Sequence, residues 1–137
     1  MADLSQTRAN VKLGNENRKT RLVQFGESVL QGQPIYADAT SNKFLQTDAN
    51  VSAAVAKAEG IVLTPASTDG WGIVVTEGLI DIGATLVVGE SYYVSRNKGA
   101  IMPVGDLQSG DYPTFLGIAV TTSLLDLQIR AGGVAKP

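Results

Sequence analysis

Short apolar runs separated by turn-forming residues follow one another along most of this chain. From Arg21 onward, each run is only a few residues long before glycine, proline, asparagine or aspartate interrupts it. Short runs of this kind are typical of β-strands. They predict strands within 21–36 and at 43–46, 60–63, 71–76, 79–82, 85–88, 91–95, 100–104, 114–121 and 124–131. Strands at this spacing indicate a β-sandwich or a β-barrel.

Residues 51–59 have the composition of a helix instead. The stretch is rich in alanine, Asn50 or Ser52 can supply an N-cap side chain, and Gly60 can end the helix. We therefore expect an all-β fold class, sandwich-like or barrel-like, with one short helix.

The second half of the chain echoes the first at an offset of 57 residues. Residues 29–36 align with 86–93, and residues 60–64 align with 117–121 at the same offset. Self-similarity at a fixed offset is the sequence signature of a repeated structural unit.

The echo predicts pseudo-repeats at about 26–82 and 83–137. They arise either from true duplication or from convergent strand–turn chemistry. If the echo is a duplication, two pairs of glycines should coincide in the structure: Gly32 with Gly89, and Gly60 with Gly117.

Charge separates an N-terminal arm from the rest of the chain. Residues 1–20 are polar and predict an extended arm, whereas 21–137 predict a β-rich body. Residues 1–21 carry a net charge of +3, and the remainder carries −5. Such an arm is either a solvated tail or a segment that orders on an acidic partner surface. The candidate partner-binding residues are Arg8, Lys12, Arg18, Lys19 and Arg21.

The residue types needed for catalysis are largely missing. The chain has no histidine and no cysteine, which removes the commonest general base, the commonest metal ligand and all thiol chemistry. Five aspartates fall in predicted turns, where aspartate has a structural role: Asp38, Asp48, Asp69, Asp106 and Asp111. No phosphate-binding glycine motif and no EF-hand spacing occurs. We therefore predict no catalytic residues, no cofactor and no metal, and a protein that is not an enzyme.

Composition also argues against two classes of partner. The net charge of −2 gives no sign of nucleic-acid binding. No apolar run reaches the roughly 18 residues of a membrane span, and the N-terminus lacks an apolar signal segment. We expect a soluble protein made in the cytoplasm.

Aromatic residues are the remaining candidates for a binding role. Trp71 lies beside glycines, and Tyr36 and Tyr93 end predicted strands. We expect these three to anchor the core or an oligomer interface. An exposed aromatic platform around Trp71, Tyr92 or Tyr93 would instead favour carbohydrate binding.

Several segments resemble the lambda-type head decoration proteins of phages. Residues 33–45 are similar to a segment in which a proline-initiated strand leads through an Asp/Ser-rich turn to a lysine and a second apolar strand. Residues 56–63 resemble a Gly-Ile-Leu strand that precedes a Thr/Asp turn, and 117–120 resemble a Gly-Ile-Ala strand of capsid cement proteins. The resemblance covers 25–83 well and the remainder loosely. This chain has a longer C-terminal half.

The resemblance implies a non-enzymatic capsid decoration (cement) protein with a β-tulip-like domain. Such proteins bind the exterior of a mature virion, commonly as trimers, and bridge neighbouring major capsid subunits. Their N-terminal arm typically adds a strand to a capsid element, a known mode of peptide recognition. The alternatives are a tail, baseplate or head-fibre module, which would share the β-rich and cysteine-free composition, and a carbohydrate-binding module.

Overall fold

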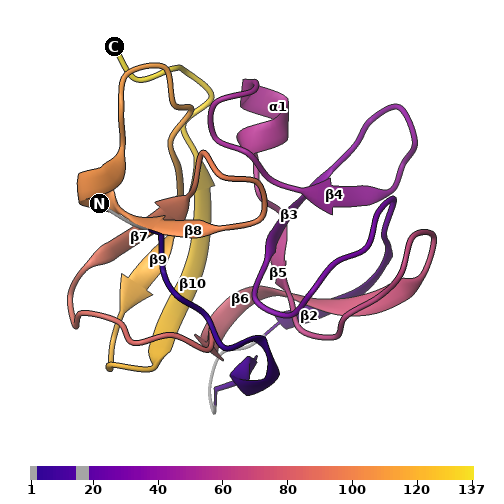
Figure 1. Ribbon diagram of the computed structural model, residues 1–137, viewed down its shortest axis with the longest axis horizontal. Coiled ribbons are helices and arrows are strands. Elements are labelled where there is room, and N and C mark those ends of the chain that lie inside the picture. The colour runs from indigo at the N-terminus through magenta and orange to yellow at the C-terminus, as the bar shows by residue number, and fades with distance from the viewer. Residues whose placement is uncertain (1–2, 15–18) are drawn as a thin grey trace.

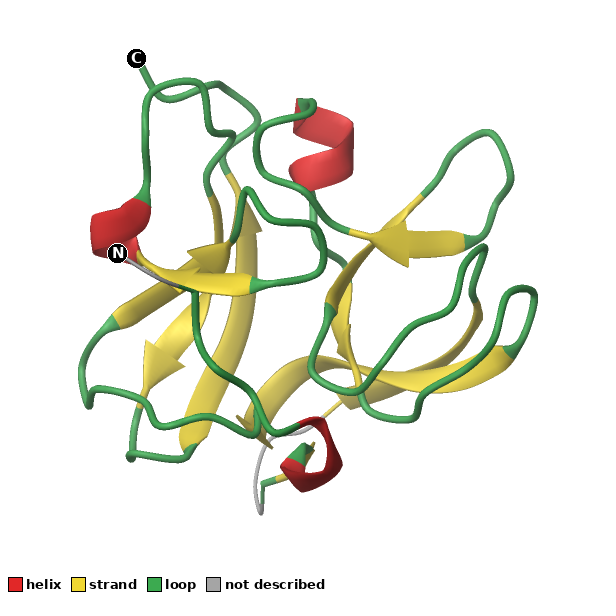
Figure 2. Cartoon of the chain, viewed as in Figure 1, coloured by secondary structure: helices red, strands yellow, loops and turns green. Residues whose placement is uncertain are grey.

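The computed structural model describes residues 3–14 and 19–137, and it confirms an all-β fold with one short α-helix (Figure 2). The helical elements are η1 Arg8–Asn10, α1 Ala53–Ala56 and η2 Val104–Asp106. The strands are β1 Lys12–Leu13, β2 Lys19–Gln24, β3 Pro34–Ala37, β4 Phe44–Gln46, β5 Gly60–Val62, β6 Trp71–Asp81, β7 Ser91–Val94, β8 Ile101–Pro103, β9 Thr114–Ala119 and β10 Leu124–Ala131.

The strands form one curled antiparallel sheet in the order β4-β3-β5-β6-β10-β9-β7-β8. β1 and β2 pair with β6 outside this path. Figure 1 shows two lobes, one with β2–β5 and the other with β7–β10, and β6 runs along the side where they meet.

β6 is a single strand that serves both lobes. Its first part pairs with β2 and β5, and its second part pairs with β1 and β10. The expectation of separate strands at 71–76 and 79–82 is wrong. Glu77 and Gly78 are not a turn, because they pair with Gln128 and Leu127 of β10.

The predicted strand at 85–88 is a turn region instead. The Leu86 amide donates to the Thr122 carbonyl, and the Glu90 amide closes a turn onto the Val87 carbonyl at 3.0 Å. The helix predicted over 51–59 is confirmed only at 53–56. Its N-cap is Ser52, whose hydroxyl accepts from the Val55 amide. Gly60 begins β5 rather than ending the helix.

The offset of 57 residues that relates the two halves of the sequence also relates their strand pairs. β3 lies between β4 and β5, just as β7 lies between β8 and β9. In the first lobe, the register joins Pro34 to Ile61, Ile35 to Gly60, Ile35 to Gln46, Tyr36 to Leu45 and Ala37 to Phe44. In the second lobe, it joins Ser91 to Ile118, Tyr92 to Gly117, Tyr92 to Pro103, Tyr93 to Met102 and Val94 to Ile101. Every second-lobe residue is 57 positions after its first-lobe counterpart.

We call these lobes the first repeat (β2–β5 with residues 71–76 of β6) and the second repeat (residues 77–81 of β6 with β7–β10). Gly32 and Gly89 occupy equivalent turns, with φ of 85° and 84°, a region that glycine enters readily. Gly32 donates to Val62, and Gly89 donates to Ala119, both at 2.8 Å.

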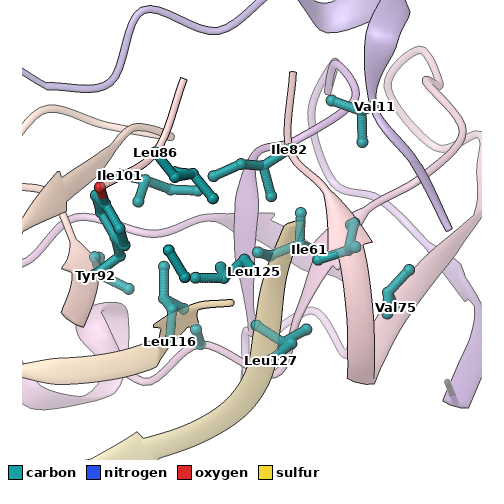
Figure 3. Packing of buried hydrophobic residues seen from close by; sticks show 14 of the residues in the cluster. Val11, Ile61, Val75, Ile82, Leu86, Tyr92, Ile101, Leu116, Leu125 and Leu127 are labelled. Atoms are coloured by element: carbon teal, nitrogen blue, oxygen red, sulfur yellow. The ribbon is translucent and has the colours of Figure 1, made fainter. Parts of the chain in front are cut away.

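The cores of the two repeats are built from equivalent positions. The first core consists of Val23, Phe25, Val29, Ile35, Phe44, Val62 and Val74. Their counterparts in the second core, at an offset of 57 for the first six and 51 for the last, are Ile80, Ile82, Leu86, Tyr92, Ile101, Ala119 and Leu125. The second core is larger (Figure 3), because it also contains residues of the first repeat and of the N-terminal segment, among them Ile61, Val75 and Val11.

Residues 3–14 lie against the second repeat. The Leu4 amide donates to the Ile101 carbonyl at 3.0 Å, and the Thr7 amide donates to the Gly83 carbonyl. The described part of the predicted arm, residues 3–14, therefore makes backbone contacts with the body. The polar composition of this segment did not predict the contact, because backbone amides make much of it and few apolar side chains are needed.

Candidate functional site

The two-stranded ribbon of β2 and β6 presents a contiguous apolar surface to solvent. Leu22 lies directly opposite Ile73, and Gln24 lies opposite Trp71. Opposed residues of an antiparallel pair project from the same face. Leu22 is 65% exposed, Trp71 is 61% exposed, and Ile73 is also exposed. We call Leu22, Trp71 and Ile73 the ribbon patch.

Alternation along β2 explains this surface. Val23, between Leu22 and Gln24, points into the first core. Successive strand residues point to opposite sides of a sheet, so the neighbours of Val23 must face outward. Large apolar groups gathered on an exposed face mark interaction surfaces more often than single exposed ones do.

β2 is also an edge strand within the described part of the chain. It pairs with β6 on one side, and no other strand pairs with it. An edge strand presents unpaired amide and carbonyl groups that can accept a further strand. The apolar face and the free edge therefore belong to the same short segment.

Two of the predicted basic residues lie on this ribbon. The Lys19 ammonium is 3.5 Å from Glu77 in a solvent-exposed ion pair, which contributes little to stability. The Arg21 guanidinium lies 5.4 Å from the centre of the Phe44 ring, a cation–π distance. Sequence reasoning identified these cations and Trp71 but missed Leu22 and Ile73, whose alternation with Val23 and Gly72 was the available signal.

Beside the ribbon is an open groove of about 820 Å³ between the two repeats. Its walls carry charges of both signs: Arg21, Lys57, Glu59, Glu77, Asp126 and Arg130. A mixed-charge groove does not select a small anion or cation. It suits a polar partner surface that enters beside the ribbon.

The other basic candidates are not part of the ribbon. Arg8 donates to Gln6 Oε1 at 2.8 Å and to the Gln31 carbonyl at 3.1 Å, so its side chain joins the N-terminal segment to the first repeat. Desolvation lowers the pKa of its guanidinium. Lys12 is exposed on β1. Arg18 lies outside the described residues.

The aromatic candidates separate into different environments. Trp71 is exposed and is not a core anchor. Tyr36 and Tyr93 are half-buried at equivalent positions of β3 and β7, and Tyr93 makes an edge contact with Phe115 at 5.7 Å between ring centres. The fully buried tyrosine is Tyr92.

Within residues 3–14 and 19–137, no cluster of three acidic side chains is placed to hold a metal ion. Among the same residues, no helix has the length and apolar character needed to cross a membrane. Asp38 has the structural role expected of a turn aspartate. Its carboxylate accepts from the hydroxyl and the amide of Ser41, and the hydroxyl contact is the main reason that its pKa is lowered.

Comparisons with protein-family models, with curated proteins and with solved structures find no match to this chain.

Proposed function

We propose that this protein is a structural virion protein that binds the outer surface of a phage capsid and stabilises neighbouring major capsid subunits. The observation that carries the proposal is the ribbon, where an apolar patch, basic side chains and a free strand edge occur together on β2 and β6. The resemblance of residues 33–45 to head decoration proteins points in the same direction.

β2 is the element best suited to contact the shell. A capsid segment can add to its free edge through main-chain hydrogen bonds while Leu22 and Trp71 contribute side-chain contacts. Residues 3–14 are less suited, because Leu4 and Thr7 already bond to the second repeat. Lys19 and Arg21 retain the role predicted for them, which is to favour an acidic shell surface.

The decisive experiment is cosedimentation with mature capsids of the cognate phage that have been stripped of accessory proteins. Wild-type protein should bind saturably. Leu22→Thr and Trp71→Ala should each weaken binding by roughly tenfold or more, as expected for centrally placed interface residues. Threonine is β-branched and therefore suits a strand.

Val51→Thr is the matched control, because Val51 is as exposed as Trp71 but lies in the loop before α1. It should bind capsids like the wild type. If wild type does not bind stripped capsids, the cement function is wrong, and the tail, baseplate or head-fibre alternative becomes the leading hypothesis. If wild type and both ribbon variants bind alike, the ribbon is not the contact.

The exposure of Trp71 also supports carbohydrate binding as a second candidate. An exposed indole offers a flat apolar surface on which a sugar ring can stack. Trp71 is the only tryptophan, so its fluorescence reports on this surface alone. Titration with a panel of cell-surface glycans should change that fluorescence if this candidate is correct, and an unchanged spectrum would exclude it.

A further inference from the structure

A pocket of about 330 Å³ lies where the N-terminal segment meets the second repeat. Its lining includes residues of the N-terminal segment, of the turn after β7 and of the η2 region: Asp3, Arg96, Asn97, Gly105, Asp106 and Gln108. The Arg96 guanidinium is 2.5 Å from the Asp111 carboxylate in an ion pair. Among the described residues, no cation is paired with Asp3 or Asp106. The pocket therefore has an excess of negative charge.

The Asp106 carboxylate is the least satisfied polar group in this pocket. Both of its oxygens are buried, and neither has a hydrogen-bond partner among the described residues. Removing an ionised carboxylate from water without a partner is costly. Buried polar groups of this kind in native proteins are explained by an ordered water or an ion at the site.

Asp111 provides a second unsatisfied oxygen immediately behind the pocket. Its side chain is 1% exposed, and its Oδ1 has no partner in the described chain. Its Oδ2 accepts from the Arg96 guanidinium and from the Gln108 amide, and both of these residues line the pocket. Arg96 also has a buried Nε–H without an acceptor, which a water in the pocket can satisfy.

Asp3 brings the N-terminal segment to the same pocket. Its Oδ1 accepts from the Ser95 hydroxyl at 2.7 Å, and its Oδ2 accepts from the Asn97 side-chain amide at 2.8 Å. Both donors are neutral, so they leave the charge of the carboxylate uncompensated. A carboxylate has about four lone-pair sites, and Asp3 can therefore bind an ion as well.

The lining residues offer only oxygen as a metal ligand. Carboxylates come from Asp3 and Asp106, and neutral carbonyl oxygens are available from Asn97, Gly105 and Gln108. Ca²⁺ prefers such a mixture, completed by water. No three acidic side chains converge within the described residues, so neutral oxygens and water must supply most of the ligands. The volume admits an ion with several waters, since each water takes up about 30 Å³.

We propose that this pocket binds Ca²⁺ and thereby fastens the N-terminal segment to the η2 region. The inference goes beyond capsid binding and does not depend on it. Asp3 directly precedes Leu4, whose amide donates to the Ile101 carbonyl, so an ion shared by Asp3 and Asp106 would hold that contact closed. Affinity should be weak, with a dissociation constant of about 10⁻⁴ to 10⁻³ M, as in Ca²⁺ sites with few charged ligands.

Thermal melts of the full chain test this without any capsid present. CaCl₂ from about 0.1 to about 10 mM brackets the expected affinity. The melting temperature of the wild type should rise over this range, because an ion that binds only the folded chain stabilises it. NaCl at matched ionic strength should not reproduce the rise. MgCl₂ should be less effective, since Mg²⁺ demands near-ideal octahedral geometry and dehydrates reluctantly. Hydrogen exchange at the Leu4 amide should slow in CaCl₂.

Asp106→Asn is the decisive variant. It should lose the response to CaCl₂, and it should be no less stable than the wild type in calcium-free buffer, because it removes a buried charge that has no partner. Asp38→Asn is the matched control, since Asp38 lies in the turn between β3 and β4 of the first repeat. It should keep the full rise in melting temperature.

Three results would overturn the proposal. A wild-type melting temperature that responds to CaCl₂ no more than to NaCl or MgCl₂ would leave water as the occupant of the pocket. An equal rise in Asp106→Asn would place the ion elsewhere on the chain. An unchanged exchange rate at Leu4 would show that a bound ion does not fasten the segment.

Discussion

The two repeats use the same backbone plan, but only one of them completes its core without help. The seven positions of the first core are all provided by the first repeat itself. The second core combines residues of the second repeat with Val11 from the N-terminal segment and with residues of the first repeat, among them Ile61 and Val75. Two units with the same strand register can therefore differ in what packs against them. Packing from outside, rather than the fold of the repeat, decides which faces remain available for partners.

The two repeats also differ in which residue donates to one equivalent backbone carbonyl, and in the second repeat the donor comes from the N-terminal segment. In the first repeat, the Phe44 carbonyl accepts from Gly26, which follows β2 in the chain. In the second repeat, the equivalent Ile101 carbonyl accepts from Leu4 instead. Residues 3–14 thus complete a hydrogen-bonding position that the first repeat satisfies internally. The segment is better described as a part of the second repeat's structure than as a separate arm.

The largest expected effect comes from the same substitution at two equivalent isoleucines. Ile61→Ala should lower the free energy of unfolding by about 2–5 kcal/mol, because it empties a fully buried site. Ile118→Ala should change it by less than about 0.5 kcal/mol at concentrations where the chain is monomeric. Urea titration of both variants provides the test. Similar losses at the two sites would contradict the difference in burial on which the comparison depends.

Removal of residues 1–10 should have the next largest effect, a loss of about 2 kcal/mol from the hydrogen bonds and the Leu4 contact. Local protection from hydrogen exchange should fall most in the second repeat, because Leu4 and Thr7 bond there. Hydrogen exchange should accelerate at β8, which the segment contacts, more than at β4. Equal acceleration at the two strands would show that the segment stabilises the whole sheet rather than one repeat.

A smaller effect is expected at a pair of left-handed turn residues. Asn42 and Gly99 are equivalent, with φ of 60° and 76°. Gly99→Asn should cost about 1 kcal/mol, because its Cβ would displace the Gln46 side chain from its bond to the Ser28 carbonyl. Asn42→Gly should change the free energy of unfolding by only a few tenths of a kcal/mol. Thermal melts of the two variants can be compared directly, and a larger loss at Asn42 would show that its side chain has a role of its own.

The smallest effect is a pH dependence that belongs to the first repeat. The Ser41 hydrogen bonds lower the pKa of Asp38 in the folded chain, so its contribution is present above the unfolded pKa and is lost as pH falls through the folded pKa. Ser95 occupies the equivalent position and carries no titrating carboxyl. The difference in melting temperature between wild type and Asp38→Asn should shrink as pH falls below about 3.9. A difference that is constant with pH would exclude this carboxylate as the cause.

The sequence predicted the repeat because turn glycines and their flanking residues are constrained locally. Gly32 and Gly89 need the same positive φ, so the similarity of these two turns can be recognised in the amino-acid sequence. The likeness of Val23 to Ile80, or of Phe25 to Ile82, was not visible, since a core position requires only an apolar side chain. The continuity of β6 was missed because Glu77-Gly78 has turn composition, and pairing with β10 overrides that local preference.

The candidate surfaces were harder to predict than the fold. Ile61 and Ile118 occur in nearly identical Gly-Ile contexts, yet one is buried and the other exposed. That difference depends on the other repeat, which no local pattern encodes. Trp71 was correctly selected as notable, but its exposed position on the ribbon depends on the pairing of β6 with β2.

The sharing of β6 has a consequence for how this chain melts. Tandem domains joined by a linker can lose structure one at a time, but a strand that is common to both repeats cannot be released from one without weakening the other. The chain should therefore behave as a single cooperative unit, with a calorimetric enthalpy equal to the van't Hoff enthalpy. The fluorescence of Trp71 in the first repeat should then change at the same denaturant concentration as the exchange protection of β9 in the second.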